Sequence, residues 1–382
     1  MPAKTGGGGL DPAGGGLAAC QTNGNLAGAL MMSETHSPPH PSLLRLIVPT
    51  VVAALILGWL LLRGGETPVV VGIEGPTMGT SYMVRLVDPP AGLDEEGLAR
   101  EVDTILERID ARMSTYDPDS ELSRINRAAG KKWIEVSAET AHVVAEGLRI
   151  AEMTAGAFDV TVGPLVNLWG FGPQGRPERI PPDEAIEAAL ARTGPAMVEV
   201  RRDPPAVRKA HDEVFVDLGG IAKGYGVDAV AERLDALGAA NYLIDVGGEI
   251  RARGVNPRGR PWQIGIETPV PGQAGVERVV APGTMALATS GDYRNFFEED
   301  GVRFSHLIDP RTGWPVAHRL ASATVLAPTC AEADALATAL MVLGPEDSLA
   351  LAEQHDWAVL LLVAVGDEFE VKTTPQFEPF LR

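Results

Sequence analysis

The stretch Ala331-Glu-Ala-Asp-Ala-Leu-Ala-Thr-Ala-Leu340 decides how this chain is interpreted. Nearly all of its residues are strong helix formers, so it predicts one buried helix. Asp334 and Thr338 are four positions apart and therefore share a face of that helix. A buried carboxylate needs a charged or hydrogen-bonding partner, and Asp and Thr supply oxygen ligands of the kind that Mg²⁺ takes. The alternative is that these two side chains only cap neighbouring loops.

The composition limits the classes of ligand. The chain of 382 residues has 51 Asp and Glu against 32 Lys and Arg, with a net charge of −19. It has no run of Lys or Arg, so nucleic-acid binding is disfavoured. A protein this acidic needs local cations, a metal or backbone amides to hold a phosphorylated ligand.

The N-terminal part differs in composition from the rest. Residues 1–42 are rich in Gly, Pro and Ser without apolar periodicity, which predicts disorder. Residues 46–62 are uncharged and mostly apolar and lie between Arg45 and Arg63, so we expect residues 43–63 to form one uncleaved transmembrane signal anchor. A short tail before a single span usually stays inside, which predicts export of the remainder. Residues 67–382 contain no linker or repeat and are interpreted as one domain.

The pattern of elements in that domain favours an α+β fold over a doubly wound sheet, because strict βαβ alternation is missing. We expect paired strands over 69–74 and 80–87 with a turn at Gly75-Pro76. Helices are predicted from the apolar stripe over 98–109, from an N-cap at Ser137 to about Met153, and over 227–237. Further strands are predicted over 214–216, 242–246, 262–267, 284–288, 321–326 and 358–363.

A glycine-rich segment, Asp217-Leu-Gly-Gly-Ile-Ala-Lys-Gly-Tyr225, follows one of these expected strands and leads into a helix. Glycines allow close backbone approach, and amides at a helix start can face an anion. Lys223 adds a positive charge there. The alternative is an ordinary turn with a solvated lysine.

Other segments combine aromatic and polar residues. Phe158 or Trp169 could line a planar ligand or simply belong to the core, and Tyr116 could stack on a ring. His306 is a candidate general base or phosphate contact, or else a surface group. Asp309 could equally be an Asx-turn residue.

Taken in order, the segments resemble the FAD:protein FMN transferases, the ApbE-type flavin transferases. The resemblance runs from Thr77-Met-Gly-Thr80 to Gly344. It includes Met-Ser-Thr-Tyr-Asp-Pro, Gly-Ala-Phe-Asp, Asp-Leu-Gly-Gly-Ile-Ala-Lys-Gly-Tyr, Val-Gly-Gly-Glu249, Ala-Thr-Ser-Gly-Asp-Tyr, His-Leu-Ile-Asp-Pro-Arg-Thr-Gly and Ala-Asp-Ala-Leu-Ala-Thr. Any one motif is weak, whereas all of them in this order are specific. Leu307, where Ile is common, and Asp245, where Asn is usual, are the departures.

The resemblance implies a single ApbE-type, T-fold-like α+β domain with an FAD cleft. It implies that Mg²⁺ assists the splitting of FAD and that FMN passes to a Thr or Ser hydroxyl of an exported flavoprotein, with release of AMP. The implied metal ligands are Asp334 and Thr338, with the carbonyl oxygens of Gly220 and Ala337. The implied FAD contacts are Met78, Tyr116, Ala157, Phe158, Asp159, Asp217, Lys223 and Ile308. His306 matches the family's candidate catalytic histidine.

Together with the predicted anchor over residues 43–63, the resemblance implies that the protein lies at the bacterial inner membrane. Its catalytic domain is then expected to face the periplasm or the cell exterior. Two other functions stay open at this point. One is a Mg²⁺-dependent FAD pyrophosphatase that forms FMN and AMP with water as the acceptor. The other is a non-catalytic, membrane-tethered flavin-binding protein, which would not need the Asp334–Thr338 pair.

Overall fold

The computed structural model describes residues 48, 51–55, 67–173, 175, 180–270, 275–292, 296–299, 302–366 and 368–382. The chain divides into two units, Met1–Glu66 and Thr67–Arg382. In the first unit the described residues are helical and exposed. Within the described part of the chain, no helix combines the length and apolar character needed to cross a bilayer. The segment 1–42, predicted to be disordered, and most of the predicted anchor 43–63 lie outside the described residues.

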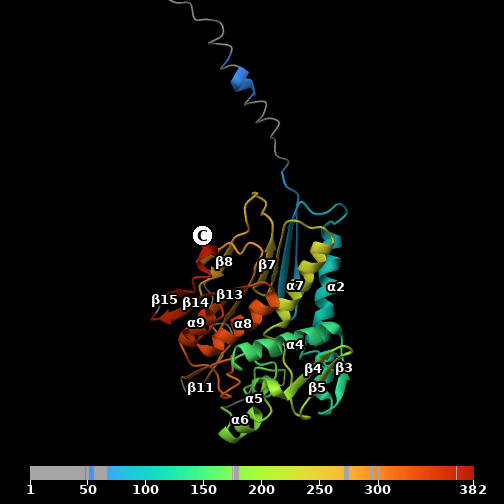
Figure 1. Ribbon diagram of the computed structural model, residues 1–382, viewed down its shortest axis with the longest axis vertical. Coiled ribbons are helices and arrows are strands. Elements are labelled where there is room, and N and C mark those ends of the chain that lie inside the picture. Colours follow the sequence, from blue (N-terminus) through green and yellow to red (C-terminus); the bar gives the residue numbers. More distant parts are fainter. Residues whose placement is uncertain are drawn as a thin grey trace, which may run out of the picture. The chain divides into compact units, whose positions relative to one another are not determined.

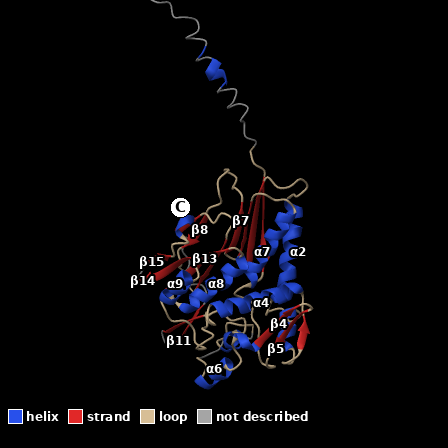
Figure 2. Ribbon diagram, in the orientation of Figure 1, coloured by secondary structure: helices blue, strands red, loops and turns tan. Residues whose placement is uncertain are grey.

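The second unit is built on an eight-stranded sheet with the order β1-β2-β6-β7-β10-β13-β14-β15 (Figure 2). Every neighbouring pair is antiparallel. Such a sheet with helices packed against it is an α+β fold, as predicted. The strands are β1 (Val70–Thr77), β2 (Thr80–Val87), β6 (Tyr242–Val246), β7 (Glu249–Arg253), β10 (Ala286–Gly291), β13 (Leu320–Ala327), β14 (Ala358–Val365) and β15 (Glu368–Thr373).

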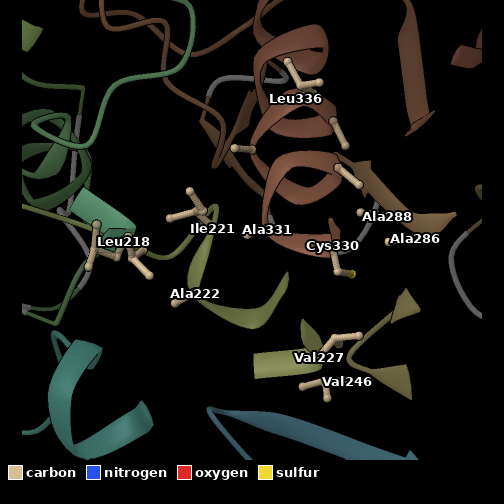
Figure 3. Close-up of a cluster of buried hydrophobic side chains, with 14 of the residues drawn as sticks. Leu218, Ile221, Ala222, Val227, Val246, Ala286, Ala288, Cys330, Ala331 and Leu336 are labelled. Atoms are coloured by element: carbon tan, nitrogen blue, oxygen red, sulfur yellow. The ribbon is translucent and has the colours of Figure 1, made fainter. Parts of the chain in front are cut away.

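Side chains alternate between two hydrophobic cores, one on each face of this sheet. On one face, Ile244 and Val246 pack with helices α2 (Glu95–Met113), α4 (Ala138–Met153), α7 (Ala222–Ala236) and α8 (Cys330–Leu343) (Figure 1). On the other face, Leu243 and Ile250 pack with β8 (Ile264–Glu267), β9 (Val276–Val280) and the C-terminal turn η2 (Glu378–Phe380). Figure 3 shows part of the first core, where Cys330 at the start of α8 lies beside Ala286 and Ala288 of β10.

Shorter elements complete the unit. A three-stranded sheet has the order β3-β5-β4, and two hairpins, β8-β9 and β11-β12, lie outside the main sheet. The remaining bounds are α3 (Glu121–Arg127), β3 (Trp133–Glu135), α5 (Gly163–Leu168), α6 (Asp183–Leu190), η1 (Pro195–Met197), β4 (Val198–Arg202), β5 (Pro205–Lys209), β11 (Phe296–Glu299), β12 (Val302–Ser305) and α9 (Pro345–Gln354).

Two local predictions are wrong. The first hairpin turns at Met78 and Gly79, which both have positive φ, and Gly75-Pro76 lies within β1. The two-residue turn needs left-handed residues, and Pro76 is tolerated because β1 is an edge strand. Residues 214–216 form no strand. The Asn126 side chain instead donates to the Val216 carbonyl and accepts from its N–H, at 2.9 and 2.7 Å, in place of a neighbouring strand.

The predicted helices are confirmed with small changes. Ser137 caps α4 by accepting a hydrogen bond from the Thr140 N–H, and α4 ends at Met153. Helix α8 is buried along most of its length. Helix α7 begins at Ala222, earlier than the predicted 227, although two glycines stand in its first turns. Its start is therefore supported by contacts with α8 rather than by propensity.

Helices α7 and α8 cap each other. The carboxylate of Asp228 on α7 accepts hydrogen bonds from the N–H groups of Cys330 and Ala331, both at 2.9 Å. In return, the carboxylate of Asp334 on α8 accepts from the N–H of Gly224 at 3.0 Å. Each carboxylate thus satisfies amides that a helix start leaves without partners, and it complements the positive end of the helix dipole. The two helices approach closely here, because a Cβ on Gly224 would lie 2.3 Å from the Cys330 carbonyl oxygen.

We expect the substitution Asp228→Ala to lower the free energy of unfolding by about 2–4 kcal/mol, because it leaves two buried amides and the Arg251 guanidinium, 2.6 Å away, without their partner. Urea unfolding followed by circular dichroism measures this. The control is Glu96→Ala, which removes an exposed ion pair with Arg100 and should cost below about 1 kcal/mol. Equal losses in the two variants would contradict the capping role.

Candidate functional site

A cleft of about 750 Å³ lies on the helix-covered side of the main sheet. It collects residues from the β1–β2 turn, the glycine-rich segment before α7, β7, β10, the segment after β12, and α8. Every site residue predicted from the sequence lines it except Ala337. The predicted site residues that line the cleft are Met78, Tyr116, Ala157, Phe158, Asp159, Asp217, Gly220, Lys223, His306, Ile308, Asp334 and Thr338.

One end of the cleft holds a cluster of three charged groups. The Lys223 ammonium is 2.8 Å from Oε1 of Glu249 and 3.6 Å from Oδ1 of Asp334. Lys223 is the second residue of α7, Glu249 is the first of β7 and Asp334 lies in α8, so the cluster joins three elements. Although burial opposes its charge, the two carboxylates hold the pKa of Lys223 well above its usual range. With one ammonium and two carboxylates, the cluster is short of positive charge when all three groups are ionised.

Glu249 is the member of this cluster for which the sequence predicted no role. Its side chain is buried, and among the described residues its Oε2 atom has no hydrogen-bond partner. Burial, followed by the neighbouring Asp334 carboxylate, raises the pKa of Glu249 to about 8, and Lys223 offsets only part of this. The Val-Gly-Gly-Glu249 motif marked the position, but a glutamate at the start of a strand carries no local signal of burial.

Oxygen ligands for a hard cation converge beside this cluster. Asp334 and Thr338 share a face of α8, and both line the cleft. Gly220 packs directly against Thr338, because a Cβ at Gly220 would lie 3.2 Å from the threonine hydroxyl. Its backbone therefore reaches the same place. Ala337 is buried within α8 and does not line the cleft, so its part as a carbonyl ligand stays a prediction.

These residues fit Mg²⁺ better than a transition metal. In the described part of the chain there is no group of three or more His, Cys, Asp or Glu side chains placed to hold a metal. Mg²⁺ does not need one, since it usually binds one or two carboxylates together with waters and substrate phosphates. One carboxylate, one hydroxyl and backbone oxygens match that pattern. A bound cation would also offset the excess negative charge that the cluster with Lys223 and Glu249 has when Glu249 is ionised.

The cleft also has aromatic walls. Phe158 is buried, and the backbone of Gly220 packs on its ring, since a Cβ there would lie 3.1 Å from the ring. Tyr116 is 69% exposed, and its hydroxyl donates to the Phe171 carbonyl oxygen at 3.4 Å. Trp169 is fully buried, and its indole N–H donates to the Gly313 carbonyl oxygen. Trp169 is therefore a core residue, while Phe158 and Tyr116 can contact a planar ligand.

Two further carboxylates line the cleft. Asp159 accepts hydrogen bonds through one oxygen from the N–H and the hydroxyl of Thr161, both at 2.7 Å. Asp217 accepts from the Gly219 N–H at 2.8 Å, also through one oxygen. Burial raises the pKa of both carboxyls. In each case the second oxygen is available to accept a hydroxyl or N–H group of a ligand.

His306 and Ile308 reach the cleft from the segment after β12. The His306 ring meets the Phe171 ring edge-on, at 6.3 Å between centroids. Ile308 is buried. The following turn is held by Asp309, whose carboxylate accepts from the Arg311 N–H at 2.9 Å, so Asp309 acts as an Asx-turn residue.

Comparisons with known proteins identify the family of this chain. The sequence profile of the ApbE family matches residues 78–361. This chain belongs to the ApbE family. A FAD:protein FMN transferase of Vibrio cholerae is 47% identical over 323 residues, which cover 84% of this chain and 96% of the relative. The enzyme of the same name from Haemophilus influenzae is 46% identical, covering 81% and 91%.

Solved ApbE structures agree with the fold as well. The flavin transferase ApbE of Vibrio cholerae superposes with a TM-score of 0.76 at 46% identity, covering 82% of this chain and 100% of that one. The apo form of the Pseudomonas stutzeri flavinyl transferase ApbE gives 0.77 at 42% identity, covering 83% and 98%. The mixed helix and sheet architecture is thus that of the family.

The raised pKa of Glu249 leads to a prediction about pH. Burial and the Asp334 carboxylate raise the pKa of Glu249 from 4.5 to about 8, so in the window between these values the folded chain keeps this proton more than the unfolded chain does. The folded state therefore binds more protons in this window, and the free energy of unfolding falls as pH rises through it. Urea unfolding in a chelator should show a shallower fall between pH 5 and 8 for Glu249→Gln than for the unchanged protein. Parallel curves would contradict a protonated Glu249.

Proposed function

We propose that this protein is a FAD:protein FMN transferase. It transfers the FMN half of FAD to a Thr or Ser hydroxyl of an exported flavoprotein, forms a phosphoester and releases AMP. The observation that carries this is the joining, in one cleft, of an aromatic wall with the Asp334–Thr338 pair and Lys223. An aromatic wall suits a flavin or adenine ring, and the charged end suits a pyrophosphate. The names of the relatives support the same activity.

Asp334, Thr338 and the carbonyl oxygen of Gly220 would hold Mg²⁺, with Ala337 as a further carbonyl ligand. When bound, Mg²⁺ neutralises pyrophosphate charge and acts as a Lewis acid. Lys223 adds a fixed positive charge at the same end, 2.8 Å from Glu249. This local charge is how so acidic a chain can bind an anionic substrate.

The remaining cleft residues would position FAD. Phe158 and Tyr116 supply ring faces, and Met78, Ala157 and Ile308 supply apolar contact. Asp159 and Asp217 each have a carboxylate oxygen left to accept a hydrogen bond from FAD. Binding to these residues fixes the position of the phosphates relative to the charged end, and positioning is most of what phosphoryl transfer needs from a protein.

The proposed reaction is a displacement at phosphorus. The acceptor oxygen forms a bond to the FMN phosphorus, the bridging P–O bond breaks, and AMP leaves with the electron pair. The hydroxyl proton passes to a base of the cleft. His306 is the candidate predicted from the sequence. Glu249 is a second candidate in its ionised form, because its Oε2 atom lacks a hydrogen-bond partner among the described residues.

Two rival functions lead to different products. A FAD pyrophosphatase would use the same metal site but release free FMN and AMP without labelling a protein. A flavin-binding protein would return intact FAD and would not need Asp334 and Thr338 together. The names of the relatives favour the transferase over both.

We further propose that residues 43–63 anchor the protein in the bacterial inner membrane and that its catalytic domain faces the periplasm or the cell exterior. The support is the uncharged apolar run between Arg45 and Arg63. An exported enzyme would meet exported acceptor proteins.

We expect the substitution Asp334→Ala to reduce both FMN transfer and Mg²⁺-dependent AMP release by at least about a thousandfold, since it removes the only carboxylate of the proposed ligand set. AMP is measured by chromatography and acceptor labelling by flavin fluorescence. The control Asp183→Ala removes an exposed carboxylate from α6 and should leave both unchanged. Metal-dependent turnover in the Asp334→Ala protein would reject this ligand assignment.

Tyr116 gives a test of the aromatic wall. Tyr116→Leu should raise the KM for FAD by about tenfold through loss of ring stacking, whereas Tyr116→Phe should change it less than about twofold because the ring stays. Initial rates at varied FAD concentration separate the two. If both variants behave alike, the ring of Tyr116 does not contact FAD.

A further inference from the structure

The main sheet is split at one place beside the cleft. The ladder between β7 and β10 ends at the pair Leu287–Ile250, while β10 continues to Gly291 in register with β13. β7 begins at Glu249, directly after the β6–β7 turn at Gly247 and Gly248, which both have positive φ. Residues 288–291 of β10 therefore have no paired strand on the β7 side within the described sheet. An open strand edge of this kind can pair with an extended peptide.

A second cavity, of about 820 Å³, lies at the same split. We call it the β8 cavity, because Ile264, Ile266 and Glu267 of β8 line it. It shares Gly247 and Thr289 with the cleft. Leu287 packs in the core on the β8 side of the sheet, and the next residue, Ala288, packs in the core on the helix side. The split in the sheet at these residues therefore opens toward both faces. The β8 cavity and the cleft thus meet there.

The lining of the β8 cavity disfavours an anionic ligand. It includes the carboxylates of Glu74, Asp245 and Glu267, and none of the described residues that line it is Lys or Arg. A second nucleotide would be repelled. A neutral or basic peptide fits this charge.

The same lining has features that a peptide would use. Ser322 lines the cavity and is only 1% exposed, and its buried hydroxyl has no hydrogen-bond partner among the described residues. Such a group is normally satisfied, so a bound peptide group would complete it. Gly75, Gly248 and Gly265 also line the cavity, and the missing side chains let another backbone come close.

We infer that the β8 cavity and the open edge of β10 form the docking site for the acceptor protein. The acceptor's Thr- or Ser-bearing segment, neutral or basic in charge, lies extended in the β8 cavity and pairs with β10 at Ala288 and Thr289, where this cavity meets the cleft. Its hydroxyl enters the cleft between Gly247 and Thr289, beside Glu249. This rests on the proposed transferase function and adds a direction: FAD fills the cleft, and the acceptor reaches it through the sheet from the opposite face. The P–O bond that forms and the one that breaks are those of the transfer described above.

The first test reverses two charges in the β8 cavity. Glu74→Lys with Glu267→Lys changes two exposed residues of the β8 cavity that are absent from the cleft lining. We expect kcat/KM for the acceptor to fall by at least about tenfold, while the Kd for FAD stays unchanged. The control, Glu368→Lys with Glu370→Lys on β15, makes the same charge change elsewhere on the sheet and should leave both values unchanged. An unchanged kcat/KM in the β8-cavity variant would overturn the docking site.

The second test locates the acceptor directly. The probe is an acceptor domain that the Vibrio cholerae relative flavinylates, with one cysteine placed two residues from its target hydroxyl. In the full chain with Cys20→Ser, Glu267→Cys should form a disulfide with it and Glu368→Cys should not. Trapping by Tyr116→Cys at the cleft instead would overturn the inference. If the unchanged chain labels no acceptor while the relative does, the proposed function itself fails, which separates the two outcomes.

Discussion

The site depends on the reciprocal capping of α7 and α8. Asp228 holds the first amides of α8, and Asp334 holds the Gly224 amide in the first turn of α7. Because Lys223 is in that same turn and Thr338 is one turn beyond Asp334, this contact sets the charged end of the cleft. Asp334 therefore has a structural role and, in our proposal, a metal-binding one. The close approach that it needs explains a glycine at position 224, where a Cβ would meet the Cys330 carbonyl oxygen.

The charges around Asp334 connect the contact between α7 and α8 with the proposed binding of a metal and a pyrophosphate. When all three groups are ionised, the cluster of Lys223, Glu249 and Asp334 has more negative than positive charge, and burial makes that costly. The raised pKa of Glu249 is one response to it. A divalent cation at Asp334 would be another, and it would bring positive charge to the place where a pyrophosphate would lie. A strongly acidic chain can thus bind an anionic substrate without a broad basic surface.

Local patterns predicted much of this from the sequence, and the misses have physical reasons. The Ser137 cap, the bounds of β6 and the buried α8 follow from capping and periodicity. The cleft residues could be predicted as one site only because the ordered motifs resemble those of a family. Spacing along the sequence does not by itself place positions 116 and 334 in one site. Residues 214–216 were predicted as a strand because nothing local reveals that the Asn126 side chain replaces a neighbouring strand. The burial of Glu249 and the split between β7 and β10 are tertiary features that local sequence does not encode.

We propose that the cleft transfers FMN to protein in a reaction that needs a divalent cation. Intact-protein and peptide mass spectrometry of an exported acceptor domain, after incubation with the unchanged enzyme and FAD, tests it most directly. With Mg²⁺ present, we expect one FMN in phosphoester linkage to a Thr or Ser and an equal amount of AMP, and with a chelator we expect neither. Free FMN and AMP with an unmodified acceptor that the Vibrio cholerae relative does label would contradict it.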